Sequence, residues 1–132
     1  MPPDKYGQWL AFARQDFKAA QVLFEEGIFN QTCFHAQQAV EKYLKAFLIR
    51  QKAPLPKVHS LIELLGVCQT YDSSLARHEQ GCRHLDQFYL PSRYPDAIVG
   101  SLPEGLPTKT HAEEALRLAS QIIDELDPEK IR

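Results

Sequence analysis

The chain has 132 residues, which favours one domain and is long enough to bury a self-sufficient hydrophobic core. It carries 15 Lys and Arg against 17 Asp and Glu, and this net charge of −2 argues against a nucleic-acid coat protein or a polybasic membrane binder. Apolar residues make up 44% and charged residues 24%, so the composition is globular and argues against disorder as the main state.

The sequence shows no transmembrane run, no secretory signal and no paired-cysteine motif. No run of about 18 apolar residues is present, so we expect no transmembrane helix. The segment Met1–Asp4 lacks the basic and apolar regions of a secretory signal. The three cysteines, Cys33, Cys68 and Cys82, show no CxxC spacing, so we expect buried free thiols and a cytoplasmic location.

Apolar residues recur at helical spacing in the first two segments. Spacings of three and four residues place each set on one face of a helix. Gly27 suits a left-handed stop after the first helix, and Asn30 is a good N-cap type for the second. The stripes are Leu10, Ala13, Phe17, Ala20 and Phe24 over residues 5–26, and Cys33, Ala36, Val40, Tyr43 and Phe47 from residue 30 to about 50.

A short helix and a further long helix are predicted between residues 61 and 89. Ser60 and Glu63 have the spacing of a capping box, which would begin a helix over 61–69. After a turn at 72–74, the next stripe consists of Leu75, His78, Cys82, Leu85 and Tyr89.

Residues 91–107 interrupt the helical pattern. They contain four of the nine prolines and two of the six glycines, so no continuous helix crosses them. Loops of this length in compact domains are often functional. A second capping box, Thr110 with Glu113, is expected to begin the last helix, which carries Ala112, Ala115, Ala119, Ile122 and Leu126 and ends before Pro128.

These segments predict an all-α fold in a single domain spanning residues 1–132. We expect an up-down antiparallel helical bundle of four long helices plus one short helix, with the Pro/Gly-rich loop before the last helix. No segment alternates with period two, so no sheet is expected. Apolar helix faces left over from the bundle predict a two-fold homodimer.

Signatures of metal sites and nucleophiles are weak. His78 and Cys82 are one helical turn apart, but both lie on the apolar stripe and no third ligand shares their face. The chain has neither a GxSxG elbow nor a glycine-rich phosphate loop. We therefore predict no metal site and no cofactor.

Cations gather near the end of the second helix and in the long loop. Five cations and no acid lie between Lys42 and Lys57. Lys42 and Lys45 would supply charge to a phosphate; the alternative is that such cations only complement the helix dipole. Arg93 beside Tyr94 would provide a bidentate phosphate contact and a ring on which a base stacks.

Arg77 and His84 form a second candidate pair. They are seven residues apart and would share a face of one helix. A histidine acting as general acid, with an arginine holding the phosphate, would suit metal-independent cleavage of RNA by its own 2′-hydroxyl. The alternative is a chance pairing, because charged residues are mostly exposed whatever their role.

Several runs, taken in order, resemble the HEPN domain, a small helical module, over nearly the whole chain. The most specific are the QQAVEKYLKA run and the RYPDA run. The matching stretches are Trp9–Gly27, Cys33–Ala46, His59–Leu65, Leu85–Tyr89, Ser92–Ala97 and the alanine-rich last helix.

The resemblance implies a helical bundle that commonly dimerises, binds a nucleotide or RNA, and partners a minimal nucleotidyltransferase in a toxin–antitoxin-like pair. The expected binding residues are Lys42, Lys45, Arg93 and Tyr94, with His59 at the start of the third helix as a further candidate. Many relatives are RNases in which four to six residues separate an arginine from a histidine on a late helix. Arg77 and His84 satisfy that spacing, so a metal-independent endoribonuclease is an alternative, and a purely structural oligomerisation module is another.

Overall fold

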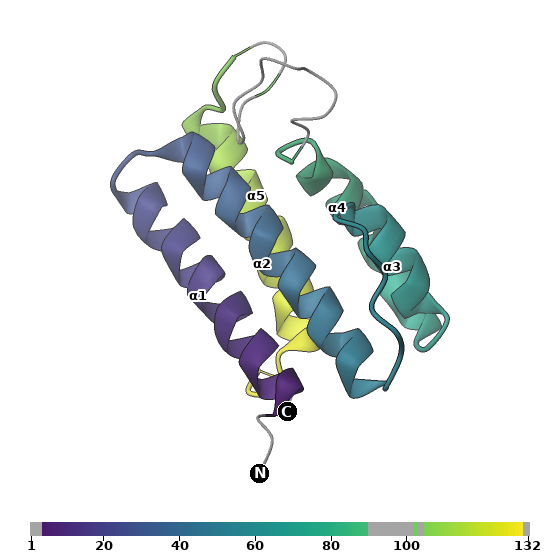
Figure 1. The fold of residues 1–132 in the computed structure, drawn as a ribbon. Helices are drawn as coiled ribbons and strands as arrows, with labels where there is room; N and C mark the ends of the chain where they lie inside the picture. Colours follow the sequence, from purple (N-terminus) through teal and green to yellow (C-terminus); the bar gives the residue numbers. More distant parts are fainter. Residues whose placement is uncertain (1–3, 90–101, 103–104, 131–132) are drawn as a thin grey trace.

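The computed structural model describes residues 4–89, 102 and 105–130, and it confirms the all-α prediction (Figure 1). Within these ranges there is no strand, only an isolated antiparallel bridge between Leu102 and Gly105. The elements are α1 (Lys5–Glu25), α2 (Phe29–Arg50), α3 (Leu61–Gln69), the 3₁₀ helix η1 (Ser73–His78), α4 (Glu79–Asp86) and α5 (Lys109–Leu126).

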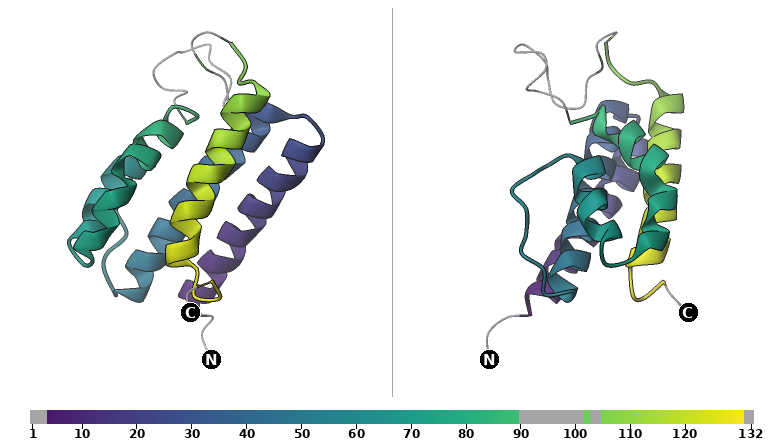
Figure 2. Two further views of the ribbon diagram at one scale, coloured as in Figure 1. Left: turned by 180° about the vertical axis from the view of Figure 1, so that it is seen from behind. Right: turned by 90° about the vertical axis from the view of Figure 1, so that its right-hand side faces the viewer.

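The helices do not strictly alternate in direction. The segment 51–60 runs back along the bundle, so α2 and α3 point the same way, as do α2 and α5 (Figures 1 and 2). The hydrogen bonds agree: Gln37 of α2 reaches the carbonyl of His59, just before α3, and Cys68 near the end of α3 reaches the carbonyl of Leu44. The crossing segment therefore brings His59 beside Gln37 on the polar side of α2.

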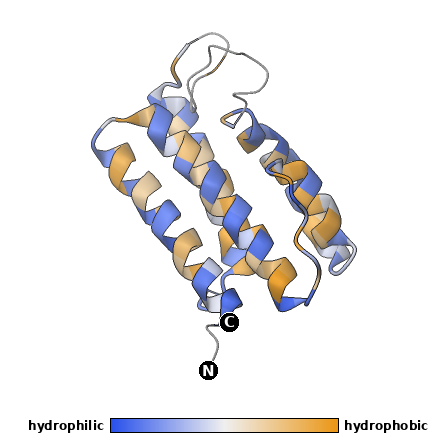
Figure 3. Cartoon of the chain, in the orientation of Figure 1, coloured by the Kyte–Doolittle hydropathy of each residue, from blue (hydrophilic) through white to orange (hydrophobic). Residues whose placement is uncertain are grey.

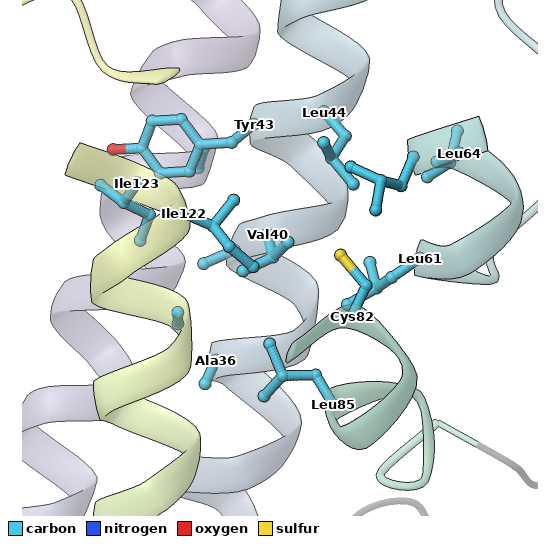
Figure 4. Close-up of a cluster of buried hydrophobic side chains, with 14 of the residues drawn as sticks. Ala36, Val40, Tyr43, Leu44, Leu61, Leu64, Cys82, Leu85, Ile122 and Ile123 are labelled. Carbon is cyan, nitrogen blue, oxygen red and sulfur yellow. The ribbon is translucent and has the colours of Figure 1, made fainter. Parts of the chain in front are cut away.

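α2 is the central helix and packs against α1, α3, α4 and α5. Figure 4 shows side chains from four helices meeting around Val40 and Leu44 of α2. The predicted stripes are buried or half-buried, as their spacing requires. The labelled partners are Leu61 and Leu64 of α3, Cys82 and Leu85 of α4, and Ile122 and Ile123 of α5.

The predicted long helix over residues 75–89 is wrong in its first part. The chain forms η1 there, and only Glu79–Asp86 is α-helical, so the described structure has three long helices and two short ones. The side chain of Asp72 accepts from Ser74 N–H and starts η1. Leu75 and His78 are both buried, and their spacing of three residues matches the three residues per turn of a 3₁₀ helix.

The helix ends follow backbone geometry more closely than residue type. Gly27 has φ +77° and ends α1 as predicted. The N-cap of α2 is Ile28, and Asn30 already lies within the helix. The predicted capping box Thr110–Glu113 is also wrong, because α5 begins earlier, with Thr108 and His111 as the reciprocal pair. Both Ser60 and Asp86 cap α3.

A polar cluster around the buried Asp127, which we name the Asp127 clamp, joins α1, α2 and the end of α5. Arg14 Nε and Nη2 donate to the Asp127 carboxylate, each at 2.8 Å, and Tyr43 Oη donates to it at 2.7 Å. The Arg14 hydrogen bonds, more than the bond from Tyr43, outweigh burial and hold the pKa of Asp127 well below its ordinary value. Burial and the bond to Asp127 raise the pKa of Tyr43.

The three cysteines are free and buried, which confirms the prediction for the thiols. Burial raises the pKa of Cys33, Cys68 and Cys82 to about 12. A thiol needs deprotonation to react, so these side chains behave as small apolar core residues.

Replacement of two glycines by alanine is expected to change the free energy of unfolding in opposite directions. A Cβ on Gly81 of α4 would meet Leu118 Cδ2 at 3.5 Å, an ordinary contact, whereas Gly27 has φ +77°. We expect Gly81→Ala to raise the free energy of unfolding by about 0.5–1 kcal/mol. Gly27→Ala should lower it by about 1 kcal/mol. Urea unfolding of both variants checks this, and equal signs would contradict the assignment of backbone conformation.

Candidate functional site

The polar side of α2 carries three buried hydrogen-bonding residues. Gln37, Glu41 and Lys45 repeat every four residues and so share one face, with 0%, 5% and 8% of each residue exposed. In Figure 3, hydrophilic residues recur between the hydrophobic ones along this helix. Burial of charge is costly unless the charge is paired, so these residues need partners.

Glu41 is paired with two residues, Lys45 and His59, which both contact the same oxygen of its carboxylate. Lys45 Nζ lies 3.2 Å from Glu41 Oε2, and His59 Nδ1 lies 3.4 Å from the same atom. Gln37 donates to the main-chain carbonyl of His59 at 3.4 Å, which fixes the loop against α2. Glu41 Oε1 is buried without a hydrogen-bond partner among the described residues.

This arrangement orients an imidazole whose other side faces solvent. The side chain of His59 is 59% exposed, whereas that of Glu41 is 7% exposed. The carboxylate beside Nδ1 orients the ring and leaves Nε2 for a ligand. Such a histidine can donate a hydrogen bond to a phosphate oxygen or exchange a proton with a bound group.

Four aromatic rings, beginning with that of His59, lie in a row that we name the ring row. The His59 and Tyr89 centroids are 5.5 Å apart, those of Tyr89 and Phe34 are 6.4 Å apart and nearly parallel at 18°, and those of Phe34 and His35 are 5.5 Å apart. All four residues are partly or well exposed. Adjacent aromatic faces of this kind are the surfaces on which unpaired bases stack.

A second carboxylate repeats the pattern at the other end of the row. Asp16 of α1 pairs with Lys42 Nζ and lies 3.4 Å from His35 Nδ1. Burial favours the neutral acid, but the hydrogen bonds from His35 and Lys42 outweigh it and lower the pKa of Asp16. The ring row therefore begins and ends on a histidine held by a carboxylate that also holds a lysine.

Asp86 fixes the two sides of the site to each other. It is the last residue of α4, and its carboxylate accepts from Leu61 N–H at 2.7 Å, from Ile62 N–H at 3.1 Å and from Ser60 Oγ at 3.0 Å. These bonds join the start of α3, next to His59, to the turn that carries Tyr89.

The structure brings three of the expected binding residues to this region. His59 is in the ring row, and Lys42 and Lys45 lie beside it. Each lysine is paired with a carboxylate, so neither contributes an uncompensated positive charge. Arg93 and Tyr94 lie outside the described residues, as does most of the expected loop 91–107, of which Leu102 and residues 105–107 are described.

Arg77 and His84 do not form the expected pair. Arg77 is in η1 and His84 is in α4, so the premise of one continuous helix is wrong. Arg77 Nε binds Glu125 at 2.7 Å, and His78 Nε2 lies 2.8 Å from the same oxygen. His84 Nε2 is buried without a partner among the described residues, and the ring meets the edge of Phe88.

Sequence reasoning missed the carboxylates and most of the ring row. By sequence alone Glu41 belongs to a polar outer face, and Asp16, Phe34 and Tyr89 are assigned to no site. The available signal was the four-residue repeat of Gln37, Glu41 and Lys45 beside the apolar stripe.

In the part of the chain that the structure describes, no helix is long and apolar enough to cross a membrane. Over the same residues, no three His, Cys, Asp or Glu side chains gather where they could hold a metal ion.

Comparisons with known proteins identify the family of this chain. The family model of the HEPN domain matches residues 6–130. The crystal structure of ST0689, an archaeal HEPN homologue, has a TM-score of 0.76 at 27% identity and covers 98% of this chain and 100% of that one. TT1696 from Thermus thermophilus has a TM-score of 0.79 at 30% identity, with the same coverage. The Methanocaldococcus jannaschii protein named "Putative toxin MJ1304" is 27% identical over 120 residues, which are 85% of this chain and 79% of that protein.

Proposed function

Since this chain belongs to the HEPN domain family, we propose that it binds a nucleotide or RNA on the ring row and acts as the partner of a minimal nucleotidyltransferase. The single observation that carries the binding proposal is the row of four partly or well exposed rings that starts at His59, with its imidazole oriented by the buried Glu41. A base would stack on Tyr89 and Phe34, and a phosphate would take a hydrogen bond from His59.

The residues that follow Tyr89 in the sequence complete the proposed site. Arg93 is four residues beyond Tyr89 in the sequence, and Tyr94 is next to it. Because Lys42 and Lys45 are neutralised by Asp16 and Glu41, Arg93 is the cation that we assign to the phosphate. Its guanidinium would supply the bidentate contact and Tyr94 a further stacking surface.

The wider biological setting is also a proposal. The name of the MJ1304 relative supports a toxin-like role, and we place this chain in a toxin–antitoxin-like pair with the transferase. We propose that it forms a homodimer, which light scattering at micromolar concentration tests. Its three free buried cysteines support a reducing compartment, the cytoplasm.

Calorimetry with AMP and with a short single-stranded RNA tests the binding site. We expect Tyr89→Ala and His59→Ala each to weaken binding about tenfold, because removal of one stacking or charged contact costs about 1–3 kcal/mol. Arg93→Ala should weaken binding by a similar factor. Arg77→Ala is the matched control, since Arg77 is bound to Glu125 away from the ring row, and its affinity should equal that of the wild type.

Two results would contradict the proposal. Unchanged affinity in both Tyr89→Ala and His59→Ala, with folding verified by circular dichroism, would remove the ring row from the site. No binding of either ligand, by the chain alone or with the transferase, would favour the purely structural module.

A further inference from the structure

A separate hollow of about 510 Å³ lies at the end of the bundle where α1 begins and α2 ends, at the lower end in Figure 1. Its walls combine an apolar surface with two lysines. They include Trp9, Ile49, Ala53 and Leu55, together with Lys5 and Lys52. We name it the Trp9 hollow; no carboxylate of a described residue lines it.

The charge of the Trp9 hollow distinguishes it from two other hollows lined by described residues. Lys5 and Lys52 are both exposed, and neither forms an ion pair with a described residue. The hollow between α1 and α5 carries both Glu113 and Arg117. In the hollow beside η1, the Arg77 charge is already neutralised by Glu125. The Trp9 hollow is therefore apolar inside and positive at its rim.

Lys52 occupies a backbone position that favours glycine. α1 and α2 end in the same way: in each, the N–H of the residue after the left-handed position reaches back five residues, from Ile28 to Leu23 at 2.9 Å and from Ala53 to Leu48 at 3.0 Å. The left-handed residue is Gly27 in the first case, but it is Lys52, with φ 60°, in the second. The lysine is strained there, whereas a glycine would not be.

The Trp9 ring is held in place by a buried cation. Lys45 Nζ lies 5.8 Å from the ring centroid, with only 8% of the residue exposed, and its position is fixed by Glu41. A preorganised ring loses little freedom when a ligand stacks or packs against it. Trp9 is also the one tryptophan of the chain, so its fluorescence reports on this hollow.

We propose that the Trp9 hollow is a second binding site, independent of the ring row, for a small phosphate monoester carried on a flat aromatic body. The ring of the ligand would lie against Trp9 and Leu55, and Lys5 and Lys52 would bind the phosphate. A nucleoside phosphate and a simple aryl phosphate share this chemistry. The apolar wall matches the aromatic body of such a ligand, and the two lysines match its phosphate.

Quenching of Trp9 fluorescence by AMP and by phenyl phosphate tests the proposal, with excitation at a wavelength that these ligands do not absorb. We expect at least one of the two to quench with saturation, and inorganic phosphate and adenosine alone to bind more weakly. Lys52→Gly should weaken the binding about tenfold, because a charge-assisted hydrogen bond is lost. The same variant relieves the left-handed strain, so its unfolding midpoint should equal or exceed that of the wild type. Lys18→Ala, at an exposed lysine outside the hollow, should bind as the wild type does.

The outcomes separate this site from the ring row and identify its ligand source. Quenching that persists in His59→Ala and Tyr89→Ala supports an independent site, and its loss in those variants would overturn independence. Saturation by phenyl phosphate but not by AMP would assign the site to aryl phosphates rather than nucleotides, within the class proposed. Absence of saturable quenching by both, or equal affinity in Lys52→Gly, would overturn the proposal.

Discussion

Replacement of Asp127 by alanine is expected to lower the free energy of unfolding by about 3 kcal/mol, because the buried Tyr43 hydroxyl and the half-buried Arg14 guanidinium lose their acceptor. Tyr43 is only 2% exposed, and its hydroxyl would lose the acceptor that it meets at 2.7 Å. Arg14 would lose both of its 2.8 Å bonds, although 35% of its side chain reaches water, which limits the loss. Urea unfolding at pH 7 measures the effect.

Glu129 provides the control for the clamp. Its carboxylate lies 3.7 Å from Arg14 Nη1 and is 77% exposed, so Glu129→Ala should change stability by less than about 0.5 kcal/mol. Equal losses for Asp127→Ala and Glu129→Ala would show that the clamp contributes no more than a surface ion pair.

The Asp127 clamp also sets a pH dependence. The pKa of Asp127 is lower in the folded chain than in the unfolded one, mainly through Arg14. Its stabilisation is therefore fully present above the unfolded pKa of about 4 and is lost as the pH falls toward the folded pKa. The difference in stability between the wild type and Asp127→Asn should shrink between about pH 5 and pH 2. A difference that grows with acidification would contradict this sign.

Replacement of Asp86 by alanine is expected to lower the free energy of unfolding by about 2 kcal/mol, since the N-terminus of α3 loses its main cap. Two main-chain N–H groups, those of Leu61 and Ile62, lose their carboxylate acceptor. Because Asp86 also joins the start of α3 to the turn that bears Tyr89, the contact between His59 and Tyr89 should loosen. Affinity for AMP or RNA should therefore fall together with stability.

Ser60→Ala is the matched variant for Asp86. Ser60 Oγ accepts from Glu63 N–H at a long 3.4 Å, so its loss should cost less, about 0.5–1 kcal/mol. If Asp86→Ala costs no more than Ser60→Ala, then Asp86 does not organise the start of α3.

The helices could be predicted because their signal is local. Spacings of three and four residues found α1, α2 and α5 and their buried faces, and the capping box of Ser60 and Glu63 found α3. The break between η1 and α4 could not be read in this way, because Leu75, His78 and Cys82 keep the same spacing across it. The N-caps at Asn30 and Thr110 failed for a related reason: many positions carry a capping residue type, and tertiary packing decides which of them is used.

The candidate site was less accessible to sequence reasoning because it depends on long-range pairs. His59 was singled out, but its partner Glu41 is 18 residues away, and Lys42 pairs with Asp16 from another helix. A buried Glu41 has the same local sequence context as an exposed one on a polar face. The crossing segment 51–60 makes the difference, and nothing in its composition predicts the direction in which it runs.

The most direct measurement of the central claim follows the His59 imidazole by nuclear magnetic resonance while AMP or a short single-stranded RNA is added. Binding on the ring row predicts that the His59 ring and the Tyr89 and Phe34 ring signals shift most and saturate together, and that the His111 ring does not shift. Saturable binding that leaves His59, Tyr89 and Phe34 unchanged would contradict the account.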